Sequence, residues 1–87
     1  MAERVTVLFF AALREQIGQD SLDVGIPSGG VSVTALRQQM EKANPAIAQA
    51  LAEQPRLRVA VNQTLSTFEH MVKPGDEVAF FPPMTGG

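Results

Sequence analysis

The pattern of apolar and polar residues predicts short strands at both ends of the chain and helices between them. Residues 5–10 are Val, Thr, Val, Leu, Phe and Phe, types that favour a strand. Nearly all of them are apolar, so we expect cover on both faces of this strand. Further strands are expected at 21–26, 58–61, 64–65 and 77–81.

Apolar residues at helical spacing predict a main helix that begins after Ser32, a good N-cap residue. Its expected inward positions are Val33, Leu36, Met40 and Ala43. A short helix is expected at 11–17, where Gly18 ends it. Another is expected after Asn44, with Pro45 in its first turn.

This order of elements is typical of an α+β roll, a mixed sheet wrapped on one main helix. We expect the first and last strands to pair in parallel at the centre of the sheet. The 87 residues suffice for one small domain. We place that domain at 1–81 and an extended tail at 82–87.

The outer face of this sheet is expected to be apolar, whereas an open sheet face is usually polar. If residues such as Val7 and Phe9 point to the helix, their neighbours point outward. The outward residues are then Leu8, Phe10, Ala60, Ala79 and Phe81. Scattered exposure or cover by 11–17 would also explain them. We favour a partner-binding patch, because two phenylalanines converge from neighbouring strands.

Composition excludes several classes of function. The hydrophobic fraction is 45%, the charged fraction 18% and the net charge −2, so we expect a globular chain without a nucleic-acid partner. No apolar run is long enough for a membrane span, and we see no signal peptide. We therefore expect a cytoplasmic protein. It has no cysteine, which excludes disulfides, thiolate metal sites and thiol nucleophiles.

Side chains that often carry chemistry have ordinary interpretations in this chain. His70 is the only histidine and has no partner at a diagnostic spacing. The neighbouring carboxylates of Asp76 and Glu77 are expected to point to opposite faces of a strand, which makes them poor candidates for a shared acid–base site. Gly29 and Gly30 lack a phosphate-loop pattern and are expected in a flexible loop. We therefore predict no metal site and no acid–base site.

The last segment has an unusual sequence. It consists of Phe81, Pro82, Pro83, Met84, Thr85, Gly86 and Gly87. The prolines stiffen the exit from the last strand, and six extended residues reach roughly 20 Å at about 3.3 Å each. The diglycine is thin enough for a narrow tunnel. Adenylation would activate its terminal carboxylate, which a sulfide donor could convert to a thiocarboxylate.

These features together resemble the small subunits of molybdopterin synthase, a family of ubiquitin-like β-grasp sulfur carriers. The resemblance runs from about Val5 to Gly87. It rests on the segments at 7–11, 14–15, 60–65, 75–83 and 85–87. The Phe-Phe-Pro-Pro lead-in separates this group from the related thiamine-pathway carrier, which shares the final Gly-Gly. Residues 25–30 match nothing and are interpreted as loop variation.

The resemblance implies a fold, a reaction and partners. A ubiquitin-activating-like enzyme would adenylate Gly87 with ATP, and a sulfurtransferase system would yield the thiocarboxylate. The tail of Pro82, Pro83, Met84, Thr85 and Gly86 would then enter the active site of the large subunit, within a heterotetramer. The sulfur would pass to cyclic pyranopterin monophosphate and form the dithiolene of molybdopterin. Phe10 and Phe81 match the family's partner interface, and Arg14 matches a nearby position. The chain would hold no cofactor itself.

Two other classes of function stay open at this point. A thiamine-pathway carrier or a ubiquitin-like modifier joined to lysines would use the same tail chemistry. A plain β-grasp interaction module would have an inert tail, and the Pro-Pro and Gly-Gly pairs argue against it. The intact mass of the protein from cells would separate a carrier from a module.

Overall fold

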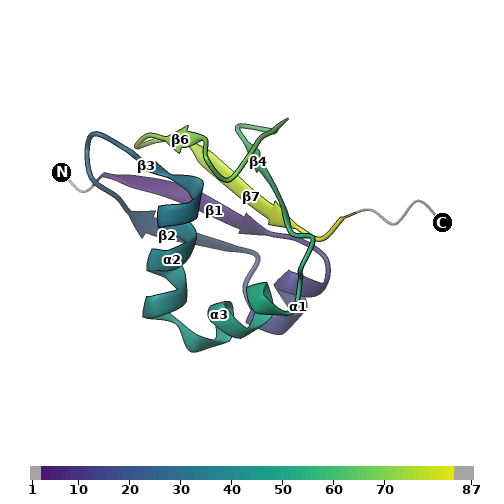
Figure 1. Ribbon diagram of the computed structural model, residues 1–87. Helices are drawn as coiled ribbons and strands as arrows, with labels where there is room; N and C mark the ends of the chain where they lie inside the picture. Colours follow the sequence, from purple (N-terminus) through teal and green to yellow (C-terminus); the bar gives the residue numbers. More distant parts are fainter. Residues whose placement is uncertain (1–2, 84–87) are drawn as a thin grey trace.

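The computed structural model describes residues 3–83 and shows helices packed against a twisted sheet (Figure 1). The main sheet has five strands in the order β2-β1-β7-β4-β5. These strands are β1 (Arg4–Phe9), β2 (Ser21–Gly25), β4 (Arg58–Val61), β5 (Thr64–Leu65) and β7 (Glu77–Phe81). The first and last strands pair in parallel at the centre, as expected, and the other pairs are antiparallel.

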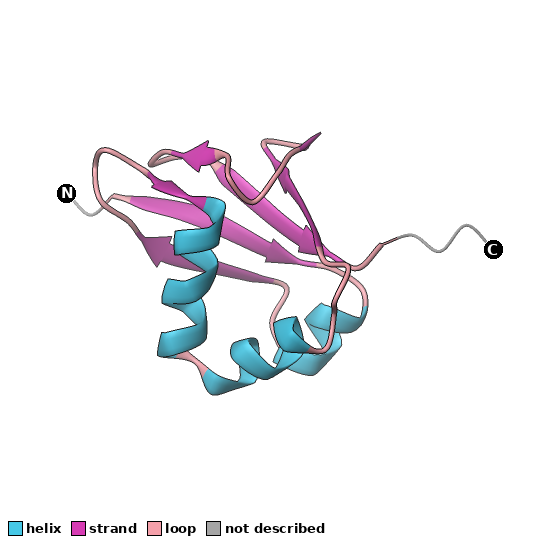
Figure 2. Cartoon of the chain, viewed as in Figure 1, coloured by secondary structure: helices cyan, strands magenta, loops and turns pink. Residues whose placement is uncertain are grey.

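The core lies between this sheet and the helices, which occupy one side of it in Figure 2. The helices are α1 (Ala12–Ile17), α2 (Val33–Ala43) and α3 (Pro45–Ala52). Leu36 and Met40 of α2 are buried together with Val7, Phe9 and Val61 of the sheet. The prediction of an α+β roll on one main helix is therefore confirmed.

Helix ends follow the residues that predicted them. Ser32 accepts a hydrogen bond on its hydroxyl from the Ala35 N–H at 3.0 Å, and Asn44 accepts one from the N–H of Ala46 at 2.9 Å. Both bonds satisfy N–H groups that the first helical turn leaves unpaired. Gly18 ends α1 in the left-handed region, at φ 84°, where a residue without Cβ is favoured.

Four expectations from the sequence were wrong in detail. The strand expected at 5–10 covers Arg4–Phe9, and the strand expected at 21–26 ends at Gly25. The first helix begins at Ala12, because Ala11 has a positive φ of 56° that no α-helix accepts. Ala43 is exposed, since α2 ends at this residue and the chain turns away into α3.

A second, two-stranded sheet was not predicted. It pairs β3 (Val31–Ser32) with β6 (Met71–Val72). Gly30 precedes it with φ 91°, and a Cβ there would lie 2.5 Å from the carbonyl oxygen of Val72. The glycine that we expected in a flexible loop therefore permits close approach of two backbone segments.

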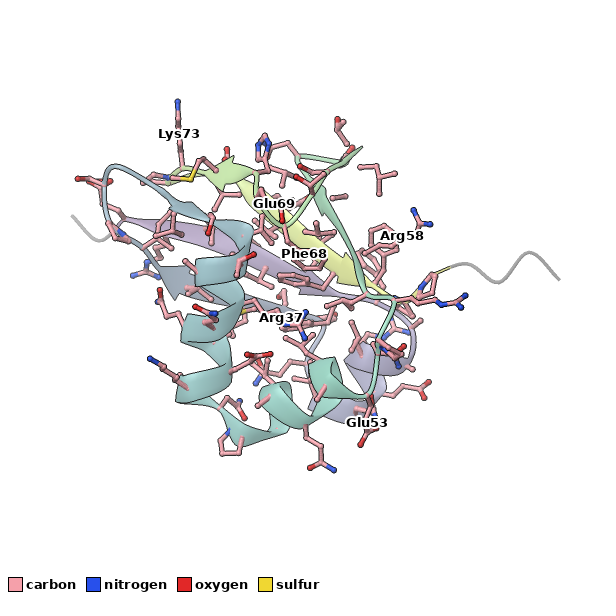
Figure 3. The ribbon with its side chains drawn as sticks, in the orientation of Figure 1. Arg37, Glu53, Arg58, Phe68, Glu69 and Lys73 are labelled. Atoms are coloured by element: carbon pink, nitrogen blue, oxygen red, sulfur yellow. The ribbon has the colours of Figure 1, made fainter. Side chains whose placement is uncertain are left out.

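The segment before β6 is fixed to the start of α2. Backbone carbonyls of His70 and Phe68 accept hydrogen bonds from the N–H groups of Val33 and Thr34, both at 2.9 Å. The Phe68 ring stacks on the ring of Phe80. The Arg37 guanidinium lies 5.8 Å from the centroid of the Phe68 ring, and Figure 3 labels both Arg37 and Phe68. His70 therefore has a structural role through its backbone, which agrees with its interpretation as a loop residue.

Candidate protein-docking site

The face of the sheet opposite the helices carries an apolar row that crosses four strands. Leu8 of β1 pairs with Ala79 of β7, Ala79 pairs with Ala60 of β4, and Ala60 pairs with Leu65 of β5. Leu8, Ala60 and Ala79 are partly exposed, and Leu65 is 60% exposed. The predicted outward direction of the first three is confirmed, and the row forms a continuous apolar strip.

A second row lies beside the first, at the end of β7. Phe81 is the last residue of that strand and pairs with Arg58 of β4. Phe10 follows β1, donates its N–H to the carbonyl oxygen of Phe80 at 3.3 Å, and is 45% exposed. Pro82 and Pro83 come directly after Phe81 and are partly exposed. The aromatic end of the face therefore borders the base of the tail.

Ala11 determines how the chain leaves this face. Its φ of 56° and ψ of −130°, together with the Leu13 N–H to Phe10 carbonyl bond of 3.2 Å, define a tight turn of type II′, whose first central position favours glycine. An alanine at this position is strained. The turn places α1 on the helix side, where Leu13 is fully buried, so α1 does not cover the outer face.

Arg14 lies at the edge of the same surface. A shallow hollow is lined by Leu8, Phe9, Phe10, Arg14, Asp20 and Ser21. The sequence placed Arg14 on a helix and both Leu8 and Phe10 on a strand. The structure brings the three residues together. Their proposed contact with a partner remains a prediction.

The opposite end of the face is polar. Thr6 of β1 pairs with Glu77 of β7 and donates its hydroxyl to Asp23 at 3.3 Å. The Lys73 N–H and the Asn62 side chain donate hydrogen bonds to the Asp76 carboxylate and hold its pKa below the usual value. Asp76 is thus a turn-stabilising carboxylate, and no acid–base pair forms at this end.

Two residues of this surface were missed from the sequence, namely Leu65 and Arg58. Leu65 could have been found from the turn at Asn62 and Gln63, whose φ values of 51° and 69° fit a two-residue hairpin that fixes the register of β5. The position of Arg58 beside Phe81 depends on the β4–β7 register, for which the sequence gives no local signal.

Residues 3–83 contain no group of three or more potential metal-ligating side chains. No helix among them is long and apolar enough to cross a membrane. Of the predicted site, Met84, Thr85, Gly86 and Gly87 lie outside the described residues. The site that the structure does describe is thus the apolar outer face of the sheet at the base of the tail.

Residues 7–87 match the model of the ThiS family. The chain belongs to this family. It is 49% identical to the molybdopterin synthase sulfur carrier subunit of Escherichia coli over 83 residues, which cover 95% of this chain and 99% of the relative. It is 45% identical to the subunit of the same name from Haemophilus influenzae, with the same coverage of both chains. The resemblance that the sequence motifs indicated is confirmed.

Solved structures agree on the fold of this ThiS-family chain. SAMP1 from Haloferax volcanii superposes with a TM-score of 0.79 at 23% identity, covering 97% of this chain and 99% of that one. Subunits 1 and 2 of the molybdopterin-converting factor from Helicobacter pylori were solved as a complex, and the similar chain has a TM-score of 0.64 at 20% identity, covering 97% and 99%. The ubiquitin-like β-grasp fold is therefore confirmed.

Proposed function

We propose that this chain is the sulfur carrier subunit of a molybdopterin synthase. The observation that carries the proposal is its similarity, over nearly the whole length, to relatives of that name, at up to 49% identity. The apolar outer face supports it, because a carrier must dock on the enzyme that loads it and on the enzyme that uses the sulfur. Exposed apolar strips of this kind mark protein interfaces.

In the proposed loading reaction, the Gly87 carboxylate attacks the α-phosphorus of ATP and pyrophosphate leaves. The resulting acyl-adenylate has a good leaving group, which the free carboxylate lacks. Sulfur at the oxidation level of hydrosulfide, supplied by a sulfurtransferase system, then attacks the acyl carbon and displaces AMP. A ubiquitin-activating-like adenylyltransferase holds the ATP in this scheme, and the carrier contributes its terminal atoms.

In the proposed transfer reaction, the loaded carrier docks on the large synthase subunit. Leu8, Phe10 and Phe81 would contact that subunit, while the tail from Pro82 to Gly87 reaches its active site. The Helicobacter pylori complex of subunits 1 and 2 supports such a pairing. Each loaded carrier would give one sulfur to cyclic pyranopterin monophosphate and regain its Gly87 carboxylate with water. Two loaded carriers would thus supply the two sulfurs of the dithiolene, within a heterotetramer of two small and two large subunits.

Two measurements on the full chain test this proposal. The intact mass of the protein from cells should include a species heavier by the difference between sulfur and oxygen. The thiocarboxylated protein should then convert the cyclic pterin when mixed with the large subunit, and a chain that lacks Gly87 should not. Full product from the shortened chain would refute the proposal.

The same experiment separates the alternatives. A thiocarboxylate that forms but yields no pterin product would indicate a carrier for another pathway, such as thiamine synthesis. Covalent adducts with lysines of other proteins would indicate a modifier. The absence of both would indicate an interaction module with an inert tail.

A further inference from the structure

Arg58 lies at the corner of the docking face, next to its aromatic end. Its backbone pairs with that of Phe81, the residue before the tail. Figure 3 shows its side chain directed away from the helices, near the end of β7. Adjacent strands lie about 4.8 Å apart. Arg58 and Phe81 are paired on two of them, and Phe10 follows β1 on the other side of β7. A protein that covers both phenylalanines will also meet Arg58.

The charge of Arg58 is not neutralised by the part of the chain that the structure describes. The ion pairs within residues 3–83 are Arg4 with Asp23 and Arg37 with Glu41. β5 pairs with Ala60 and Val61 of β4, so it does not extend alongside Arg58. The side chain is exposed, which leaves its guanidinium hydrated and available.

Docking over the aromatic end would remove water from this guanidinium. Removing water from an arginine costs free energy unless the guanidinium gains a counter-charge. A partner that covers Arg58 therefore binds favourably only if it supplies an anion. A planar guanidinium matches a carboxylate through two parallel hydrogen bonds. The complementary surface is therefore an apolar pocket bordered by an Asp or Glu side chain.

We propose that Arg58 pairs with a carboxylate of the large synthase subunit beside the pocket that receives Phe81, and thereby selects the cognate subunit. This inference rests on the proposed function, which supplies the occupant of the face. Apolar contact alone would accept many exposed patches, whereas an arginine at the rim penalises any partner without an acid at that place. Arg58 is thus a specificity-determining residue and takes no part in the chemistry.

The test is the affinity of the full chain for the large subunit, measured by calorimetry at low and high salt. Arg58→Glu should weaken binding by about tenfold or more at low salt, and the loss should shrink at high salt because ions screen the pair. The matched control is Lys42→Glu, which makes the same change of net charge at an exposed position of α2. It should change affinity less than about twofold.

A charge exchange makes the test specific. Replacing the acidic residue beside the large subunit's pocket with Lys should restore binding of Arg58→Glu and weaken binding of the unchanged carrier. Equal effects of Arg58→Glu and Lys42→Glu would overturn the inference, as would failure of every such exchange. In both cases the proposed function would survive if the unchanged carrier still binds and yields product. Absence of any binding by the unchanged carrier would refute both.

Discussion

Asn62 donates a hydrogen bond from its side-chain nitrogen to the carboxylate of Asp76 at 3.1 Å. The amide oxygen of the same side chain accepts the N–H of Glu77 at 3.0 Å. Asn62 therefore ties the β4–β5 turn to the start of β7 through both ends of its amide. Asp76 completes the connection by accepting the N–H of Lys73 at 2.8 Å.

This connection predicts how stability depends on pH. Hydrogen bonds, first from the Lys73 N–H and then from Asn62, lower the pKa of Asp76. A carboxyl group whose pKa is lower in the folded state stabilises the protein above the unfolded value of about 3.9. That stabilisation is lost as the pH falls through the folded pKa. The difference in urea midpoint between the unchanged chain and Asp76→Asn should therefore shrink from pH 6 to pH 3. A constant difference would contradict this assignment.

The core prediction concerns Leu36, which is fully buried in α2 against the sheet. Leu36→Ala removes buried methyl groups and leaves a cavity, and should lower the free energy of unfolding by about 2–5 kcal/mol. Denaturant titration measures this loss. Gln38→Ala, at an exposed position of the same helix, should change it little. A loss below about 0.5 kcal/mol for Leu36→Ala would contradict the packing described above.

Replacing Ala11 with glycine should stabilise the protein, whereas most substitutions destabilise a folded protein. Alanine at φ 56° and ψ −130° is strained by about 1–3 kcal/mol, while glycine accepts this conformation at an entropic cost of about 0.4–1 kcal/mol. Ala11→Gly should therefore raise the thermal midpoint. Ala12→Gly, one residue later inside α1, should lower it. The turn described here is excluded if Ala11→Gly destabilises as much as its neighbour.

Phe81 should serve two partners in turn. Phe81→Ala should weaken binding of both the large subunit and the adenylyltransferase by about 1–3 kcal/mol, with little effect on folding, because the side chain is partly exposed. Met71→Ala is the control, since Met71 is 53% exposed on β6. We expect both partners to use this one face, so they should compete in a binding assay. A ternary complex would show that they dock at different places.

The tail prediction concerns Gly86. Its replacement by Leu should slow sulfur transfer from the thiocarboxylated chain, because a Cβ and its branches widen the backbone where it enters the partner's active site. Affinity for the large subunit should fall much less, since the globular part still docks. Thr85→Val, which conserves side-chain volume, provides the control. Unchanged single-turnover rates for Gly86→Leu would argue against a narrow entry.

Residues in regular elements were predictable from the sequence, because period and propensity act locally. Alternation placed Val59 and Phe80 inside and Ala60 and Ala79 outside, and the structure agrees. The strands β3 and β6 could not be predicted in this way, since two residues carry no period and neither strand follows a hairpin turn such as the one at Asn62 and Gln63 that leads into β5. They form because the segment near His70 packs on the start of α2, a contact between distant parts of the chain.

In the candidate site, too, some features follow from local periodicity and others depend on contacts between distant segments. The outward direction of Leu8 and Phe81 follows from alternation within one strand. Phe81 and Arg58 are neighbours because their strands pair, and this pairing depends on the whole fold. The strained conformation of Ala11 also had no signal, because alanine is a good helix former and tertiary packing overrides that preference here.

The parallel pairing of β1 with β7 joins the first and last strands of the sequence, since Thr6 lies opposite Glu77. Contacts between such distant residues form late and slowly in folding, because closing a long loop costs entropy. Phe10 and Phe81 become neighbours only when this central pair has closed. An enzyme that recognises both side chains at once would therefore discriminate against incompletely folded carriers, and sulfur would be loaded only onto chains whose folding is complete.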